Sequence, residues 1–214
     1  MESKEVKKVV LIVAHPDDET LWAGGIMLSE PKWQWFVICL CRKSDPHRAL
    51  KFYKALALLG ATGIMGDLDD GPEQKPLQDN EVQQEILRLT PGIHFDLIIT
   101  HNPDGEYTRH LRHEEVSKAV INLWGECKLM TVALWTFAYE DGNKAYYPKA
   151  ETQASSCWHL PQKLWELKYN IITQTYGFDK NSWEAETTPR DEAFWHFSNA
   201  QQAKNWLAKK GTSS

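Results

Sequence analysis

Two short segments of this 214-residue chain carry most of the residue types that do chemistry in enzymes. Residues 15–19, with the sequence His-Pro-Asp-Asp-Glu, directly follow a run of apolar residues, and His110 and His113 stand three residues apart in a later segment. One imidazole and three carboxylates within five residues concentrate negative charge, which is costly unless positive charge offsets it. Either the N-terminus of a following helix or a divalent cation can supply that charge. The first segment alone therefore fits helix capping and metal binding equally well.

The second segment favours the metal. Two histidines three residues apart lie on the same face of a helix and can converge on one point. Together with one histidine and one or two aspartates of the first segment, they make a three-ligand set typical of catalytic zinc, which leaves the fourth position to water. Iron or cobalt can occupy such a site too. This hypothesis requires that the strands preceding the two segments are neighbours, because ligands bind to open α/β sheets where the strand order reverses.

Strand and helix patterns alternate along the first two thirds of the chain. Apolar runs predict strands at residues 9–14, 35–40, 61–65, 95–100 and 129–137. Apolar spacing predicts helices at residues 21–29, 46–59, 81–89 and 110–124, with Thr20 as the cap of the first. Because such alternation builds parallel sheets, we expect an α/β fold: a three-layer, Rossmann-like, mostly parallel sheet with helices on both faces and a helical C-terminal extension.

The length fits a single domain over residues 1–214. Within it we expect the Rossmann-like core at residues 7–140 and a substrate-facing extension at residues 141–214, with helices inside 158–176 and at 190–209. Five of the ten tryptophans lie in this extension, between Trp158 and Trp206. An indole ring can carry the apolar face of a sugar. Trp183, expected in the loop between the two helices, is therefore a candidate substrate wall, and packing is the alternative.

Composition excludes several classes of protein. The 24 basic and 29 acidic residues give a net charge of −5, which argues against nucleic-acid binding because that needs a basic surface. The sequence contains no glycine-rich phosphate loop of the nucleotide-binding kinds. The apolar runs are too short for a membrane span. The four cysteines form no CxxC pair, so we expect reduced thiols in the core of a cytoplasmic protein. The partners that remain are small molecules and further copies of the chain.

The residues 15–19 after an apolar strand, followed by a His-x-x-His at the start of a later helix, carry a resemblance to a known family. The chain resembles the PIG-L/LmbE family of zinc-dependent N-deacetylases, which remove acetyl from N-acetylglucosamine units in small conjugates or lipids. The resemblance spans roughly residues 7–177. Further matching positions are Gly24-Gly25, Arg48, Asp70-Gly71, residues 105–107, Leu160-Pro161 and Lys168.

The resemblance implies a role for each matching residue of the two segments. The zinc ligands would be His15, Asp18 and His113. Asp17 would be the general base that deprotonates a zinc-bound water. His110, in its protonated form, would stabilise the oxyanion or protonate the leaving amine.

The residues expected near the substrate are Arg48, Asp70, Tyr107 and Trp183, the last on the grounds given above. Three departures from the family pattern surround this region. One is Lys51, which stands three residues after Arg48, where the family often has an acidic residue. Thr108 and Arg109 separate Tyr107 from the first histidine of the His-x-x-His, where the family usually has one residue, and Leu111-Arg112 stands where Pro-Asp is common inside that motif. These departures concern the identity of the substrate more than the type of reaction.

The sequence therefore predicts zinc-dependent hydrolysis of an N-acetyl amide on an N-acetylglucosamine-type sugar conjugate, which releases acetate and a free amine. Two alternatives stay open: a zinc amidase acting on another small amide, such as a thiol conjugate or an acylated antibiotic, and a catalytically inactive, metal-containing module that binds a sugar. Glu19 supports the loop, caps the helix or orients a ligand. His101, at the end of the fourth strand, either faces the site or is an ordinary strand-end residue.

Overall fold

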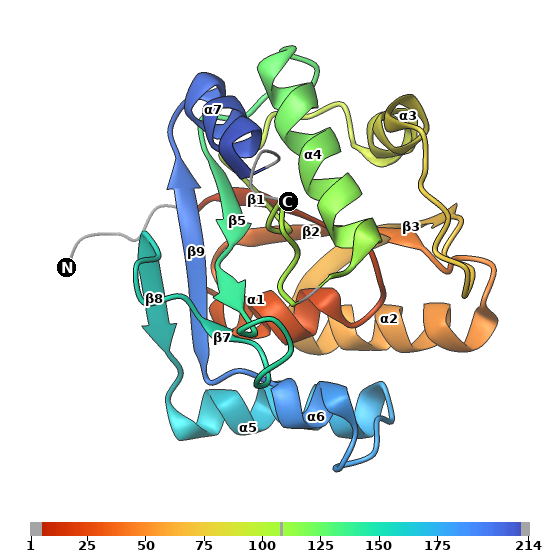
Figure 1. The fold of residues 1–214 in the computed structure, drawn as a ribbon. Helices are drawn as coiled ribbons and strands as arrows, with labels where there is room; N and C mark the ends of the chain where they lie inside the picture. The colour runs from red at the N-terminus through yellow and green to blue at the C-terminus, as the bar shows by residue number, and fades with distance from the viewer. Residues whose placement is uncertain (1–5, 108, 211–214) are drawn as a thin grey trace.

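The computed structural model describes residues 6–107 and 109–210, so Thr108 lies outside the described residues. The described chain forms a seven-stranded sheet in the order β3-β2-β1-β4-β5-β9-β8 (Figure 1). Its strands are β1 (Lys8–Val13), β2 (Gln34–Cys41), β3 (Ala61–Leu68), β4 (Leu97–Thr100), β5 (Leu134–Phe137), β8 (Ser156–His159) and β9 (Asp191–Phe197). β1 pairs in parallel with β2 on one side and with β4 on the other. The first and fourth predicted strands are thus neighbours, as the metal hypothesis required.

Helices cover both faces of this sheet and complete the three expected layers (Figure 1). One face carries α1 (Asp18–Ser29), α2 (Pro46–Leu59), α5 (Gln162–Asn170) and α6 (Trp183–Thr187). The other face carries α3 (Asp79–Leu89), α4 (Leu111–Gly125) and α7 (Ala200–Lys210). A π-helix, η1 (Ile171–Thr175), continues α5, and two short strands, β6 (Tyr139–Glu140) and β7 (Lys149–Ala150), pair with each other.

The alternation of side chains along β1 explains why its sequence is apolar without a break. Val9, Leu11 and Val13 belong to the hydrophobic core under α1 and α2, whereas Val10 and Ile12 belong to the core under α3 and α4. Successive side chains of a strand point to opposite faces, and a parallel strand covered on both faces needs apolar residues at every position. The continuous run is thus the signature of the central strand that ends at the candidate site.

The C-terminal third differs from the expected pair of helices. Residues 190–209 are not one helix, because β9 occupies the first part and α7 only the second. β9 pairs antiparallel with β5 and with β8. Its side chains alternate between the two cores, since Phe194 packs in one and Trp195 and Phe197 pack against the other. This period of two is that of a strand, so the helical expectation for this part was wrong.

Three smaller expectations also change. α1 begins at Asp18 with Asp17 at the N-cap position, so Thr20 lies inside the helix and is not its cap. All four cysteines are free, but Cys127 and Cys157 are exposed, and only the other two lie in the core. Trp183 begins the short helix α6 instead of lying in a loop. Within residues 6–107 and 109–210, no helix combines the length and the apolar character that crossing a membrane requires.

Candidate active site

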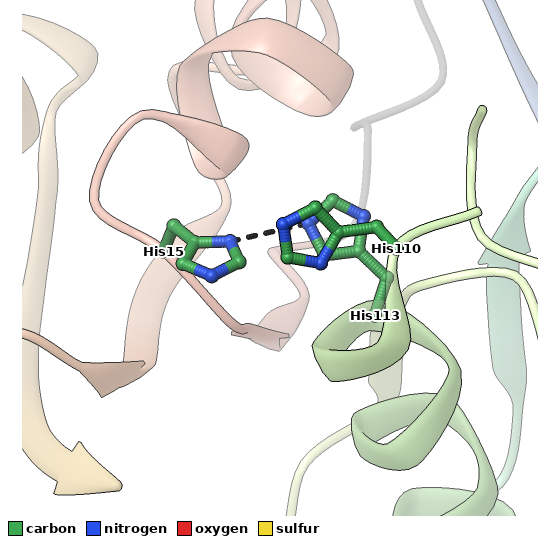
Figure 2. Close-up of side chains that lie close together, drawn as sticks. All are labelled: His15, His110 and His113. Carbon is green, nitrogen blue, oxygen red and sulfur yellow. Dashed lines mark hydrogen bonds between the residues drawn. The ribbon is translucent and has the colours of Figure 1, made fainter. Parts of the chain in front are cut away.

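The two chemistry-bearing segments meet at the carboxyl edge of the sheet. His15 lies in the loop between β1 and α1, and His110 and His113 lie at the start of α4, which follows β4. Because β1 and β4 are adjacent parallel strands, both loops leave the sheet at the same edge. In Figure 2 the His15 ring lies on one side and the stacked rings of His110 and His113 lie on the other. The His15 ring is turned toward that of His113.

His113 belongs to two groups of side chains whose potential ligand atoms lie close enough to hold a metal ion, one with His15 and His110 and the other with Asp18 and His101. His15 Nδ1 lies 3.2 Å from His113 Nε2 and 3.3 Å from Asp18 Oδ2. Asp18 Oδ1 lies 3.4 Å from His113 Nε2. Tetrahedral ligands at zinc bond lengths stand about 3.3 Å apart. His15, Asp18 and His113 have this spacing pair by pair, with the two histidines next to different oxygens of Asp18. Although burial opposes its charge, the imidazoles of His113 and His101 lower the pKa of Asp18 well below its usual range, which keeps this carboxylate ionised.

The far nitrogen of His113 is held by a carboxylate. Glu106 Oε2 lies 2.5 Å from His113 Nδ1 and 2.9 Å from His101 Nδ1, and all three side chains are fully buried. A proton on Nδ1 of His113 leaves Nε2 with a lone pair directed at the candidate metal position. His101 also faces the site, with its ring stacked 3.9 Å from that of His113. His101 forms one of the two groups of potential ligands together with Asp18 and His113, but its Nε2 accepts the N–H of Ala14 at 3.0 Å, so its lone pair is engaged.

The backbone of Asp17 is strained, and side chains outside the loop between β1 and α1 hold it in this conformation. Asp17 has φ 129°, which residues with a Cβ rarely adopt. Its N–H donates to Glu19 Oε2 at 3.1 Å. Glu19 is itself fully buried, and its Oε1 accepts from the hydroxyls of Tyr176 and Thr20. Glu19 thus supports the loop, one of the roles that the sequence left open.

The surroundings of Asp17 and His110 shift both groups toward the uncharged form. Burial and the neighbouring Asp18 carboxylate raise the pKa of Asp17 well above its usual value, although the Arg48 guanidinium, 3.5 Å from Asp17 Oδ2, opposes this. Burial and the neighbouring His113 and His15 rings lower the pKa of His110 to about 3. This shift favours a neutral imidazole at His110, whereas the role that the resemblance implies needs a protonated ring. Its buried Nδ1 has no hydrogen-bond partner among the described residues.

The family follows from the sequence match that accompanies this geometry. Residues 10–124 match the family PIG-L, described as GlcNAc-PI de-N-acetylase. The chain belongs to the PIG-L family. The match contains both segments of the candidate site, from the loop after β1 to the start of α4.

Relatives of this PIG-L chain are distant in sequence. It is 22% identical over 179 residues to an uncharacterised protein of Acanthamoeba polyphaga mimivirus, and the match covers 76% of each chain. It is also 22% identical over 151 residues to the 1D-myo-inositol 2-acetamido-2-deoxy-alpha-D-glucopyranoside deacetylase of Corynebacterium diphtheriae. This match covers 53% of this chain and 52% of the deacetylase.

Solved structures share the fold of the PIG-L chain. The N,N'-diacetylchitobiose deacetylase of Pyrococcus horikoshii is similar with a TM-score of 0.69 at 17% identity, covering 91% of this chain and 85% of that one. GalB, the 4-carboxy-2-hydroxymuconate hydratase of Pseudomonas putida, is similar with a TM-score of 0.61 at 15% identity, covering 89% and 96%. At these identities the likeness concerns the fold alone, and the fold carries more than one kind of chemistry.

A cleft of about 590 Å³ lies beside the histidines of this PIG-L chain, and Tyr107 and Trp183 are among its lining residues. The Tyr107 ring is 5.6 Å from the rings of both His110 and His113, and 4.6 Å from that of Trp183. The other two substrate candidates lie outside the lining. Arg48 stands beside Asp17, and Asp70 contacts His15.

Glu106 is a candidate site residue to which the sequence analysis assigns no role. The sequence places it only among residues 105–107, which resemble the family. Its position between the end of β4 and the His-x-x-His, seven residues before His113, was the available signal. A carboxylate so placed can reach the far nitrogen of a ligand histidine, which is a common arrangement at metal sites.

Proposed function

We propose that this PIG-L chain is a zinc-dependent N-deacetylase that hydrolyses the N-acetyl amide of an N-acetylglucosamine-type sugar conjugate, releasing acetate and a free amine. The observation that carries the proposal is the convergence of the donor atoms of His15, Asp18 and His113 at spacings of 3.2–3.4 Å, with the Asp17 carboxylate next to them. Iron or cobalt would fit the same donors. The family and the deacetylases among its structural neighbours support this assignment.

A zinc ion bound by these residues would polarise the acetyl carbonyl and lower the pKa of a water toward 7. Asp17 would accept the proton of that water, because burial raises its pKa well above its usual value and so makes the carboxylate a stronger base. The Arg48 guanidinium, 3.5 Å from Asp17 Oδ2, partly offsets this shift and so favours the ionised carboxylate that accepts the proton. The proton then passes from Asp17 to the nitrogen of the leaving amine, which balances the hydrolysis.

His110 acts in this scheme as a neutral hydrogen-bond donor. The low pKa of His110 favours the neutral ring, so we propose that it stabilises the developing oxyanion through an N–H and not through a full positive charge. One such hydrogen bond is typically worth about 3 kcal/mol in the transition state. Tyr107 and Trp183 would form the aromatic wall against which the apolar face of the sugar packs.

Metal analysis combined with acetate release from a panel of N-acetylglucosamine conjugates tests the proposal. We expect about one equivalent of bound divalent metal, acetate from at least one conjugate, and loss of acetate release when the metal is removed by a chelator. Zinc should restore the activity. A protein that binds metal but releases no acetate from any conjugate would contradict the deacetylase assignment and favour a different small amide or a sugar-binding role.

Several sequence predictions stay predictions. They are the division of one domain into residues 7–140 and 141–214, a cytoplasmic location, a homo-oligomeric state and the absence of nucleic-acid binding. The proposed partner is a small amino-sugar conjugate. Size-exclusion chromatography with light scattering would determine the oligomeric state directly.

A further inference from the structure

The residue between the two histidines of α4 has an unusual set of partners. Arg112 occupies one of the positions where this chain departs from the Pro-Asp of the family pattern, and its side chain is only 1% exposed. Its Nε donates to the Asp69 carbonyl at 2.6 Å, and its Nη2 donates to the Lys75 carbonyl at 2.7 Å. Its Nη1 pairs with Glu115, which also accepts the N–H of Leu77 at 2.8 Å. One guanidinium thus fixes residues 69–77, here named the strap, to α4.

The strap carries Asp70, and Asp70 reaches His15. Asp70 Oδ1 lies 3.1 Å from His15 Nε2 and accepts from Gln74 Nε2 at 2.8 Å. Asp70 Oδ2 accepts from Arg42 Nε at 2.8 Å, and the Asp70 carbonyl accepts from Arg42 Nη2 at 2.7 Å. Both carboxylate oxygens are therefore engaged by protein groups, which fixes the direction from which Asp70 meets the imidazole.

The two nitrogens of His15 have different surroundings as a result. Nε2 faces the carboxylate of Asp70, whereas Nδ1 faces His113 Nε2 and Asp18 Oδ2 on the candidate metal side. An imidazole binds a metal through the nitrogen that lacks a proton, and a carboxylate acceptor holds the proton on the other nitrogen. Asp70 thus serves His15 as Glu106 serves His113.

We propose that Arg112 is a positioning residue for the metal centre. Through the strap it holds Asp70 against His15, so that the ring keeps its proton on Nε2 and directs the Nδ1 lone pair at the metal. The inference rests on the proposed function, because it takes His15 as a metal ligand. It gives a role to Arg112, which in the sequence is only a departure from the family pattern.

The test compares Arg112→Lys and Asp70→Asn with Arg88→Lys, a control that alters an arginine paired with Glu85 on the exposed side of α3. Ring ¹⁵N chemical shifts in the metal-free protein report the tautomer of His15. We expect the Nε2–H tautomer in the unmodified protein and in the control, and a mixture of tautomers in the other two variants. Titration with zinc against a competing chelator should show affinity about 10–100-fold lower in both variants, with the double variant no weaker than the weaker single variant.

Two results would overturn the inference. The first is an Nδ1–H tautomer of His15 in the unmodified protein. The second is a lower melting temperature of Arg112→Lys without any change in the His15 tautomer or zinc affinity, which would make Arg112 purely structural. If Arg112→Lys does not fold, Asp70→Asn decides whether the strap acts on His15. Neither measurement uses acetate release, so a chain that shows the expected tautomers but releases no acetate refutes only the proposed function.

Discussion

A buried ion pair in the C-terminal third of the chain also holds α1, the helix that follows the first candidate segment. Disruption of this pair should lower the free energy of unfolding. Lys168 Nζ on α5 donates to Glu192 Oε1 on β9 at 2.7 Å, and both side chains are fully buried. Glu192 also accepts the N–H groups of Gly25 and Ile26, in the middle of α1, at 2.6 and 2.7 Å. The carboxylate therefore connects three elements at one point.

The size of the expected loss of stability follows from the groups that Lys168→Met would leave unpaired. Glu192 would remain buried with its two backbone donors but without a cation, and removal of one partner of a buried pair costs about 3–5 kcal/mol. For a chain of this size, 1 kcal/mol corresponds to about 2–4 °C in the melting temperature, so we expect a decrease of about 6–20 °C. The matched control is Lys118→Met, because the pair of Lys118 with Asp79 is exposed and should contribute little.

A second variant separates lost charge balance from lost packing. Glu192→Gln in the Lys168→Met background removes the unpaired charge and keeps one oxygen acceptor for the α1 backbone. We expect the double variant to lose clearly less stability than the sum of the two single variants, measured by urea unfolding and calorimetry. Strict additivity of the two free energies of unfolding would refute the reasoning, because it would mean that the charges do not interact in the folded protein.

Three further predictions concern the site. Asp17→Asn should keep metal binding, measured by metal analysis, and lower kcat by at least about 100-fold; equal loss of metal and activity would make Asp17 a ligand. Glu106→Gln should lower zinc affinity about 10–100-fold in a chelator competition assay, because the proton on His113 Nδ1 loses its charged acceptor. Trp183→Ala should raise KM for a sugar substrate more than it lowers kcat, and an unchanged KM would exclude Trp183 from the substrate wall.

The parts of the fold that the sequence predicted well are those fixed by local patterns. β1 and α4 were expected because a continuous apolar run and a helical spacing are properties of neighbouring residues. β9 was mistaken for a helix because its alternation becomes visible only when both cores are known: Phe194 faces one and Trp195 the other. Pairing with β5 determines that segment, and pairing between distant strands leaves little trace in one sequence.

The residues of the candidate site also divide into those that local sequence patterns predict and those that depend on distant contacts. The motifs indicate a ligand set of this kind, the family resemblance implies that it is His15, Asp18 and His113, and the structure brings these side chains together. Glu106 and Asp70 hold the far nitrogens of the two histidines, but neither function could be predicted. A contact of this kind depends on how a loop folds over a helix, and the sequence separation between His15 and Asp70 is 55 residues.

The region that matches the family ends at residue 124, yet the support of the candidate site extends well beyond it. Glu192 holds the backbone of α1 at its centre, and Tyr176 donates to Glu19 at 2.7 Å, which in turn accepts the N–H of the strained Asp17. Strained backbone persists only where surrounding contacts fix it. Since Tyr176 supports Asp17 through Glu19 and Glu192 holds the helix that follows, the C-terminal third does more than line the cleft. It also supports the loop after β1 in the conformation that places Asp17 beside the candidate metal ligands.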